Sequence, residues 1–555
     1  MHPTSSLAAR RTAALLTVAL AGAGLAAVPA TAGTAAPQRV VVTSLTGDAA
    51  AAARAVQAAG GRVLDRLSLI GGVSATLPAG TVLAPAYRVV ANSPLQVAGK
   101  SGDDTGTAIG VRSVLGLGKN GHEGRGVTVA VVDTGVADVQ DLQGRVTHVN
   151  VVGGHGGDGY GHGTFVAGLI AGNGSSSDGT YAGVAPAADV LDVKVADANG
   201  NTDLVTVLKG LQAVAAHPAV DVVNLSLSSE SPLPYQIDPL TAALESLWRR
   251  GVTVVVPAGN ESDAIASPGN DPVLLTAGGL DDHGTAARGD DTVATWSGRG
   301  PAPQGVQKPD LVAPGAHVVS LRAPGSVVDA AHPEAVVGSA YFKGSGTSFS
   351  TAVTSGAAAA LLSHRSKLTP EQVKAALTGS AYDGAGLSDV DAAGAGALDL
   401  KAAYNAKVKD VATTAVAPIP GDPAVWADLL AALLDGNEQA AASSWSKLSD
   451  AARNWAASSW SGLSLDARNW AASSWSARNW AGSDWAARNW AARNWAARNW
   501  ADSDWSASSW SARNWAASSW SASSWSARNW AEDDWAARNW AASSWSARNW
   551  AATWN

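Results

Sequence analysis

Runs of apolar residues of strand length, separated by helical segments, constrain the fold of residues 106–405 more than any other feature of this sequence. Residues 127–132 and 252–256 are almost continuously apolar, and residues 190–195 and 220–227 are rich in valine and leucine. Strands that are buried on both faces have this composition, and they belong to parallel sheets covered by helices. The sequence therefore predicts an α/β domain with a mostly parallel sheet and helices on both faces.

The segment before this domain begins with an export signature. Arg10 and Arg11 precede an apolar run that reaches about residue 28 and meets the small residues 30–32. A positive start, a short apolar stretch and small residues at the end are typical of a secretory signal peptide. The run is short and rich in alanine and glycine, which favours cleavage over a membrane anchor. We expect residues 1–32 to be removed and the mature chain to be extracellular, free or associated with the cell surface, without a transmembrane segment.

Residues 33–105 have the pattern of a small α+β unit. The stretches 38–44 and 73–77 predict strands, and the alanine-rich stretch 48–60 predicts a helix that ends at a glycine pair. The loop at 102–106 contains glycine and aspartate and marks a boundary. We expect this unit to fold separately from the domain that follows.

Residues 406–442 are a proline-containing linker, and residues 443–555 are a repeat. Tryptophan recurs there in steps of five, without a gap from Trp470 to Trp550. Five residues advance an α-helix by about 500°, so successive tryptophans would wind around its whole surface. In a strand, an odd period sends successive residues to opposite faces. Neither element alone buries the tryptophans on one side.

Four interpretations of the repeat stay open. One is a coil with one five-residue repeat on each side of a square, and another is a low-complexity tail that becomes ordered only on contact. The third is a binding surface, because tryptophan stacks on sugars or other aromatic groups and a nearby arginine adds cation–π contacts. The fourth is a cargo that the preceding domain itself releases, which only the linker favours. We expect the tail to bind cell-surface material or to associate with itself.

Charge and cysteine content exclude several classes of function. The net charge is −8, the sequence pI is about 5.7 and there is no long run of Lys or Arg, so nucleic acid is not an expected partner. The chain has no cysteine. Disulfides, thiolate catalysis and cysteine-bound zinc are therefore excluded.

Four polar residues lie in motifs that suit nucleophilic catalysis. Asp133, in VVDTGV, follows the apolar stretch 127–132 and so lies at the C-terminal end of a strand, where open α/β sheets place their sites. His162 lies between glycines in GHGTFVAG, Asn260 ends VVVPAGN, and Ser348 begins a small-residue helix in GSGTSFS. Serine-dependent acyl transfer needs a hydroxyl nucleophile, a base, a carboxylate that orients the base, and a donor for the oxyanion.

Each of these residues taken alone has an ordinary structural explanation. An aspartate after a strand is usually a cap or turn residue, and a serine in a Gly/Ser/Thr-rich loop is usually a helix N-cap. The order Asp, His, Asn, Ser within one α/β stretch is what indicates catalysis. His155 and Asp158, near His162, do not have a spacing typical of zinc ligands.

With these motifs, residues 106–405 resemble the catalytic domain of subtilisin-like serine proteases, the subtilase family. The matching motifs are VAVVDTGV, GHGTFVAG, VVNLSLS, PAGN, KPDLVAPG and GTSFS, and the triad order differs from that of chymotrypsin-like and α/β-hydrolase enzymes. The resemblance implies a serine-type endopeptidase. In it, Asp133 orients His162, His162 acts as general base and then acid, Ser348 is the nucleophile and Asn260 donates to the oxyanion.

The resemblance also implies a substrate-binding strand and a pocket for the side chain before the scissile bond. The implied substrate-binding residues are Leu225, Ser226, Leu227, Ser228, Ala258 and Gly259. Three departures from the family pattern affect substrate preference more than activity. Ala352 stands where proline is usual, Pro257 stands where alanine is commoner, and Ser228 and Ser229 stand where paired glycines often occur.

Residues 33–105 resemble the inhibitory pro-segment with which such enzymes fold and which they then cut off; an accessory domain is the alternative. We therefore expect an autoprocessed precursor. Calcium is common in the family, and Asp138 and Asp141 are candidate ligands for a structural ion, although short Asp-rich loops are usually solvated turns. No metal ligand is assigned, and catalysis is expected to need no cofactor.

Two functions of different classes follow. The first is a secreted serine endopeptidase that acts on protein or peptide substrates and carries a binding tail. The second is a surface binding protein whose subtilase domain is an inactive scaffold beside an adhesive tryptophan repeat. The complete set of Asp133, His162, Ser348 and Asn260 favours the enzyme.

Overall fold

The computed structural model describes most residues between 37 and 449 and several strands of the C-terminal repeat. The described residues are 37–97 except 80 and 85, 109–118, 123–229, 235–262, 264–300, 306–409, 411, 412, 414, 425, 426, 428, 429, 438–449, 452, 486, 487, 505–507, 510–515, 520–522, 525–530 and 546–548. The predicted signal peptide, residues 1–32, lies outside them. Among the described residues, no helix is both long and apolar enough to cross a membrane.

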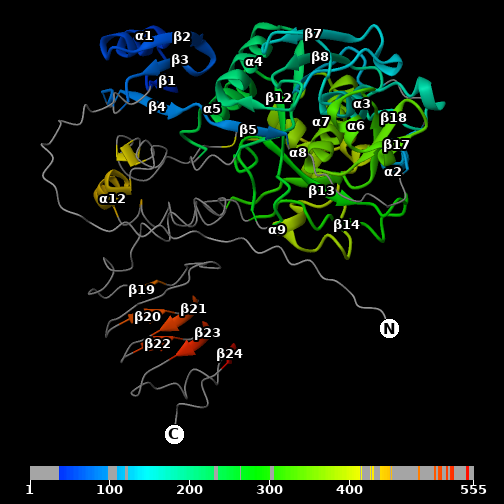
Figure 1. The fold of residues 1–555 in the computed structure, drawn as a ribbon. Helices are drawn as coiled ribbons and strands as arrows, with labels where there is room; N and C mark the ends of the chain where they lie inside the picture. The colour runs from blue at the N-terminus through cyan, green and yellow to red at the C-terminus, as the bar shows by residue number, and fades with distance from the viewer. Residues whose placement is uncertain are drawn as a thin grey trace, which may run out of the picture. The chain divides into compact units, whose positions relative to one another are not determined.

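A mostly parallel sheet forms the centre of the main domain (Figure 1). Its described strands follow the order β14, β13, β12, β10, β6, β8, β7, and β15 also pairs with β13. All these neighbours are parallel except β13 and β14. The bounds are β6 Thr128–Asp133, β7 Val146–Asn150, β8 Asp189–Lys194, β10 Val220–Leu225, β12 Thr253–Pro257, β13 Leu275–Asp281, β14 Thr292–Val293 and β15 Leu311–Pro314.

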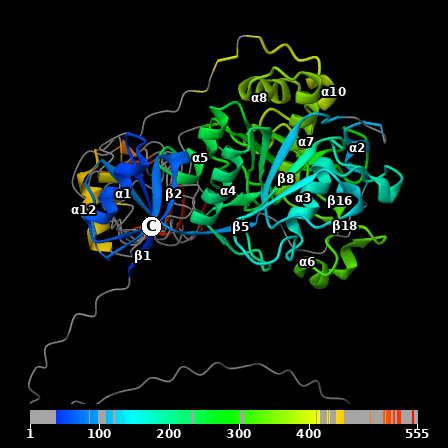
Figure 2. The same ribbon diagram turned by 90° about the horizontal axis from the view of Figure 1, so that it is seen from above.

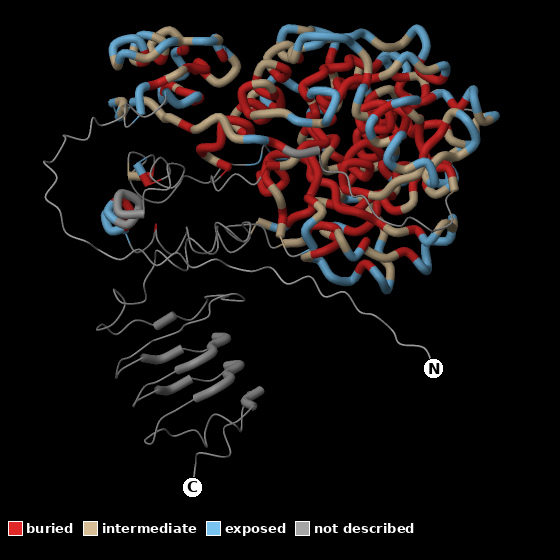
Figure 3. Tube along the Cα trace, viewed as in Figure 1, coloured by how far each residue is buried: buried red, intermediate tan, exposed pale blue. Residues whose placement is uncertain are grey.

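Helices cover both faces of this sheet. Successive strand residues point to opposite faces, and Val129 through Val132 on β6 are all fully buried, so neither face is open to solvent. Figure 2 shows α3 and α4 on opposite sides of β8, and buried residues gather around the sheet in Figure 3. The prediction of an α/β fold with a mostly parallel, helix-covered sheet is confirmed. The main helices are α3 His162–Ala171, α4 Leu204–Ala216, α5 Pro239–Trp248, α7 Thr347–His364 and α8 Pro370–Gly379.

Smaller elements complete the domain. Strands β16, β18 and β17 form a small antiparallel sheet in that order. Its strand β18 ends three residues before α7 begins, so this sheet directly precedes that helix in the chain. The bounds of these and the remaining short elements are α2 Val111–Val114, α6 Val327–Ala331, β16 Val318–Leu321, β17 Val336–Val337, β18 Tyr341–Gly344, α9 Val390–Ala393 and α10 Leu400–Ala403.

The N-terminal unit has the predicted α+β architecture. An antiparallel sheet with the order β2, β3, β1, β4 carries the helix α1, whose N-terminus is capped by Asp48. Val40, Val42 and Val56 belong to a separate small core in this unit. The bounds are β1 Gln38–Ser44, α1 Ala49–Ala58, β2 Arg62–Leu67, β3 Gly72–Leu77 and β4 Tyr87–Ala91.

The strand that follows this unit pairs with the main domain. Strand β5 (Pro94–Val97) lies antiparallel to β11 (Leu227–Ser228) on one side and to β9 (Thr202–Asp203) on the other. Val97 is opposite Leu227 in this register. A segment within the predicted unit 33–105 thus pairs with the strand implied to bind substrate.

Short parallel strands occur in the tryptophan repeat. Strand β20 pairs with β22 fifteen residues later, β21 with β23 at the same interval, and β23 with β24 twenty residues later. These intervals are three and four five-residue repeats. The helix α12 (Glu438–Lys447) spans the end of the linker and the start of the repeat. The bounds of the strands are β19 Ala486–Ala487, β20 Trp505–Ala507, β21 Trp510–Trp515, β22 Trp520–Ala522, β23 Trp525–Trp530 and β24 Ser546–Arg548.

Candidate active site

Three buried polar residues from three separate elements define the candidate site. Asp133 is the last residue of β6, His162 is the first residue of α3, and Ser348 is the second residue of α7. Asp133 and Ser348 are completely inaccessible, and 6% of the surface of His162 is exposed. The site therefore lies at the C-terminal end of a central parallel strand, as expected for an open α/β sheet.

Asp133 and His162 form a buried hydrogen-bonded pair. The Nδ1 atom of His162 lies 2.8 Å from Oδ1 of Asp133, and the backbone N–H of Thr134 donates to the same oxygen at 2.7 Å. A carboxylate only accepts hydrogen bonds, so Nδ1 carries the proton and Nε2 is the basic nitrogen. Among the described residues, Nε2 of His162 is buried without a hydrogen-bond partner.

Ser348 is held beside the end of β10. Its hydroxyl donates to the carbonyl oxygen of Ser226 at 3.3 Å, and the Ser226 hydroxyl donates to the carbonyl of Ser348 at 3.1 Å. The next residue, Phe349, stacks on the His162 ring with 5.6 Å between ring centroids, so the imidazole lies beside the start of α7. The Ser348 hydroxyl is not bonded to Nε2 in this structure; such catalytic bonds are often long or misaligned without substrate.

Asn260 orients the start of α7. Its Oδ1 atom accepts hydrogen bonds from the backbone N–H and the hydroxyl of Thr347, each at 3.0 Å. The residue before α7 is Gly346, which offers no side-chain cap, so Asn260 replaces it as the partner of a helix N-terminal N–H. These bonds fix the carboxamide oxygen at Thr347, the residue directly before Ser348.

The predicted substrate-binding residues have different environments. Leu227 and Ser228 form β11, which pairs with β5. Leu225 is fully buried in the main hydrophobic core and pairs with Val132 of β6, so its side chain packs in the interior. Ala258 is buried and accepts, through its carbonyl, a hydrogen bond from the N–H of Ala266.

The residues that depart from the family pattern lie in the helix α7, at the end of β12 and just after β11. Ala352 is fully buried within α7, and Pro257 is the last residue of β12. Ser229 forms a bridge with Ser267, to whose carbonyl its N–H donates at 2.9 Å. None of these residues interrupts the bonds of Asp133, His162 or Asn260.

Two buried residues beside Asp133 and His162 were not among the site residues predicted from the sequence. Asp158 and Thr134 are both buried, and the Thr134 hydroxyl donates to Asp158 Oδ1 at 2.8 Å. Lys194, at the end of β8, is also buried and donates to the carbonyl of Thr134. The position of Asp158, four residues before His162, was the available sequence signal.

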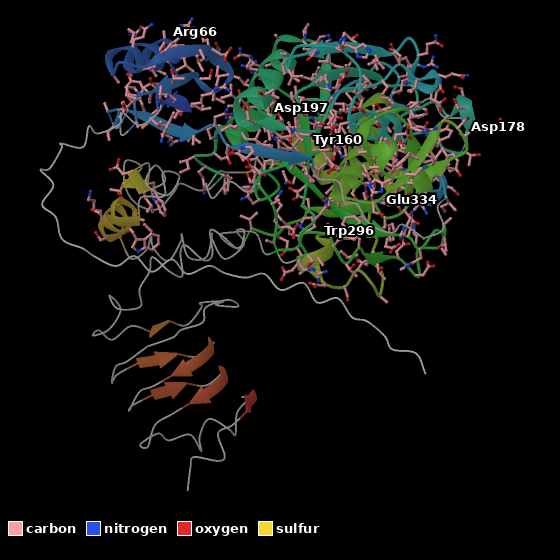
Figure 4. The ribbon with its side chains drawn as sticks, viewed as in Figure 1. Arg66, Tyr160, Asp178, Asp197, Trp296 and Glu334 are labelled. Carbon is pink, nitrogen blue, oxygen red and sulfur yellow. The ribbon has the colours of Figure 1, made fainter. Side chains whose placement is uncertain are left out.

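Burial and the neighbouring carboxylates change the acidity of Tyr160, which is labelled in Figure 4. Burial raises the pKa of its hydroxyl, and the negative charges of Asp133 and Asp158 raise it further. Both effects favour the neutral phenol. Tyr160 therefore stays uncharged at neutral pH beside the loop that carries His162.

The candidate calcium ligands have different environments. Both oxygens of Asp141 are occupied by protein donors: Oδ1 by Ser175 and Ser176, and Oδ2 by the Tyr341 hydroxyl at 2.6 Å. Asp138 is fully exposed. In the part of the chain that the structure describes, no group of three or more His, Asp or Glu side chains is arranged to hold a metal ion. The proposed ion at Asp138 and Asp141 stays a prediction.

Comparisons with known proteins identify relatives of the domain that carries this site. The model of the subtilase family matches residues 124–400. The serine protease AprX of Bacillus subtilis is 41% identical over 266 residues, which are 45% of this chain and 60% of AprX. Subtilisin Savinase of Lederbergia lenta is 35% identical over 241 residues, which are 43% of this chain and 77% of that protein.

A solved structure shares the fold. Fervidolysin from Fervidobacterium pennivorans, a keratinolytic enzyme related to subtilisin, superposes with a TM-score of 0.54 at 22% identity, over 70% of this chain and 63% of fervidolysin. The chain thus spans less than two thirds of AprX and of fervidolysin. The matched family model, the identity to subtilisin Savinase and the subtilisin-like fold show that this chain belongs to the subtilase family.

Proposed function

We propose that this chain is a serine endopeptidase in which Ser348 attacks the peptide carbonyl and His162 takes its proton. The observation that carries the proposal is the buried 2.8 Å bond between Asp133 and His162, which leaves Nε2 as the basic nitrogen beside the helix of Ser348. Membership of the subtilase family supports the same assignment.

The residues supply each proton transfer of two-step hydrolysis. As Ser348 Oγ forms its bond to the carbonyl carbon, its proton moves to Nε2 of His162, and Asp133 stabilises the resulting imidazolium through Nδ1–H. The imidazolium then gives that proton to the departing amine, and an acyl-enzyme remains. Water repeats the sequence with His162 as base, which releases the acid and restores Ser348.

Two donors are available for the negative charge on the carbonyl oxygen. Ser348 is the second residue of α7, so its backbone N–H has no partner within the helix, and the helix N-terminus favours negative charge. The carboxamide nitrogen of Asn260 is the second proposed donor. The two bonds from Thr347 to Asn260 Oδ1 support this role, because they hold the amide in one orientation before substrate arrives.

We also propose that the chain is exported and that residues 33–105 are a pro-segment removed by the enzyme itself. Strand β5 pairs with β11 next to Ser226, whose carbonyl contacts the Ser348 hydroxyl, so a segment of the chain lies where a peptide substrate would pair. Asn92 also accepts a hydrogen bond from Val205 at the start of α4, at 2.9 Å. Residues 1–32 support export through their signal-peptide pattern.

Labelling with a serine-directed fluorophosphonate tests the enzymatic proposal. The folded protein, freed of residues 33–105, is expected to be labelled, and the Ser348→Ala variant is the control. If the processed wild-type protein is folded but unlabelled, the endopeptidase proposal is wrong, and the chain is an inactive scaffold with a binding tail.

A further inference from the structure

A buried carboxylate outside the triad accepts hydrogen bonds from both triad loops. Asp158 lies four residues before His162, and only 9% of its surface is exposed. Its Oδ1 atom accepts from the Thr134 hydroxyl at 2.8 Å and from the N–H of Gly161 at 2.7 Å. Its Oδ2 atom accepts from the N–H and the hydroxyl of Thr164, at 2.8 and 2.7 Å.

The hydrogen-bond partners of Asp158 lie next to Asp133 and His162 in the chain. Thr134 follows Asp133, and its N–H donates to the Asp133 carboxylate at 2.7 Å. Gly161 precedes His162, and Gly163 follows it and donates from its N–H to the Thr134 hydroxyl at 2.9 Å. A continuous set of hydrogen bonds therefore connects the carboxylate of Asp133 to the backbone on both sides of His162.

The helix that carries His162 depends on this carboxylate for its N-terminal donors. The residue before α3 is Gly161, which has a positive φ of 109° and no side chain to act as a cap. Asp158 accepts from the N–H of Thr164, the third residue of α3, as an N-cap side chain would. A negative charge at this end of a helix is also favourable. The position of the first residue, His162, is therefore coupled to Asp158.

We propose that Asp158 is a positioning residue that sets the placement of His162 relative to Asp133. This inference rests on the proposed function, because it assigns Asp158 to the geometry of that triad. The hydrogen bonds of Asp158 go to Thr134, Gly161 and Thr164 and not to the reacting side chains, so its loss should reduce kcat and leave KM nearly unchanged. A misplacement on the order of 1 Å in a catalytic group reduces rates by about 100-fold, so we expect a decrease in kcat of about 10- to 100-fold for a smaller shift.

The test variant is Asp158→Asn in the full, processed enzyme. The amide keeps the size of the carboxylate but has one acceptor oxygen, so the N–H of Gly161 or of Thr164 must face another N–H group. Asp141→Asn is the matched control. Asp141 is also buried and also accepts four hydrogen bonds, from Ser175, Ser176 and Tyr341, but it does not bond to a neighbour of Asp133 or His162.

Two measurements distinguish positioning from general destabilisation. The first is kcat and KM on a small chromogenic peptide, with the melting temperature of each variant. The second is the proton NMR resonance of His162 Nδ1–H, recorded for each variant as a precursor that also carries Ser348→Ala, which prevents self-digestion. This proton lies in the hydrogen bond to Asp133, so its resonance reports that bond directly. We expect Asp158→Asn to shift or broaden it and Asp141→Asn to leave it unchanged.

The outcomes separate this inference from the proposed function. If wild-type protein is not labelled by the fluorophosphonate, the proposed function fails. If wild-type protein is active but Asp158→Asn has a normal kcat, or moves kcat and the resonance no more than Asp141→Asn does, the positioning role is wrong. Should Asp158→Asn not fold, Thr134→Val removes only the hydroxyl that joins Asp158 to Gly163. It is expected to lower kcat and move the same resonance, and an unchanged kcat and resonance would overturn the inference.

Discussion

Gly163 lies directly after His162 and has no room for a side chain. A Cβ atom built on it would overlap the carbonyl oxygen of Gly135 and would lie 3.1 Å from the Gly135 nitrogen and 3.2 Å from Cβ of Asp133. The first of these is backbone in the loop after Asp133, so no flexible side chain can move away. Gly163→Ala must therefore push the start of α3 away from the loop that follows Asp133.

The expected effect follows from the size of that displacement. Relief of the overlap with the Gly135 carbonyl needs a shift on the order of 1 Å between the two segments, and a misplacement of that size reduces catalysis by about 100-fold. Alanine is favoured over glycine inside a helix by about 1 kcal/mol, so helix propensity alone predicts that the variant is more stable. We expect the clash to dominate, with a lower melting temperature and a kcat reduced by about 100-fold.

Gly156→Ala is the matched control for this variant. Gly156 lies in the same Gly-rich segment, has no atom within 4 Å of a built Cβ, and does not have a positive φ. The assay is kcat and KM on a small peptide, with the rate of fluorophosphonate labelling as a check on Ser348. A Gly163→Ala enzyme with the kcat of Gly156→Ala would refute the claim that close approach of these backbones sets the catalytic geometry.

Three further predictions concern the oxyanion, maturation and the tail. Asn260→Ala is expected to fold and to lose about 10²–10³ in kcat. This range is the cost of removing one oxyanion donor in subtilisin, a member of the same family. A change in KM with normal kcat would show that Asn260 is not such a donor. Ser348→Ala made as precursor is expected to keep residues 33–105 by mass spectrometry, and normal trimming would indicate another protease. Truncation after about Val416 is expected to preserve turnover of a small peptide and to reduce the cell-bound fraction. Loss of turnover would contradict the domain division, and unchanged retention would contradict the binding role of the repeat.

The sequence predicted the triad candidates because each lies in a short motif beside a recognisable element. Asp133 follows an apolar stretch and Ser348 begins a helix, and both patterns are local in the chain. Asp158 and Thr134 could not be found in this way, because an aspartate between glycines is an ordinary loop residue until its four donors are known. Those donors come from residues 134, 161 and 164, and only folding brings the first of them to Asp158.

The position of β5 also depended on the tertiary structure. The pattern of residues 33–105 predicted a separate α+β unit, and residues 38–91 do form one with its own core. Residues 94–97 pair instead with β9 and β11 of the main domain. A short extended segment of four residues carries no periodicity that identifies its neighbour, because alternation specifies which face a side chain occupies and not which strand lies beside it.

The sequence by itself determined the α/β class, the buried parallel strands and the position of each catalytic candidate at the end of an element. These properties depend on local burial and on residue type, so they can be read along the chain. The tertiary structure alone decided which strands are neighbours, that β5 lies against β11, and that the tryptophan repeat pairs at intervals of fifteen and twenty residues. A period of five allows any multiple of five between paired strands. The interval and the neighbour are set by which backbone N–H and C=O groups meet when the chain folds, and no single segment contains that information.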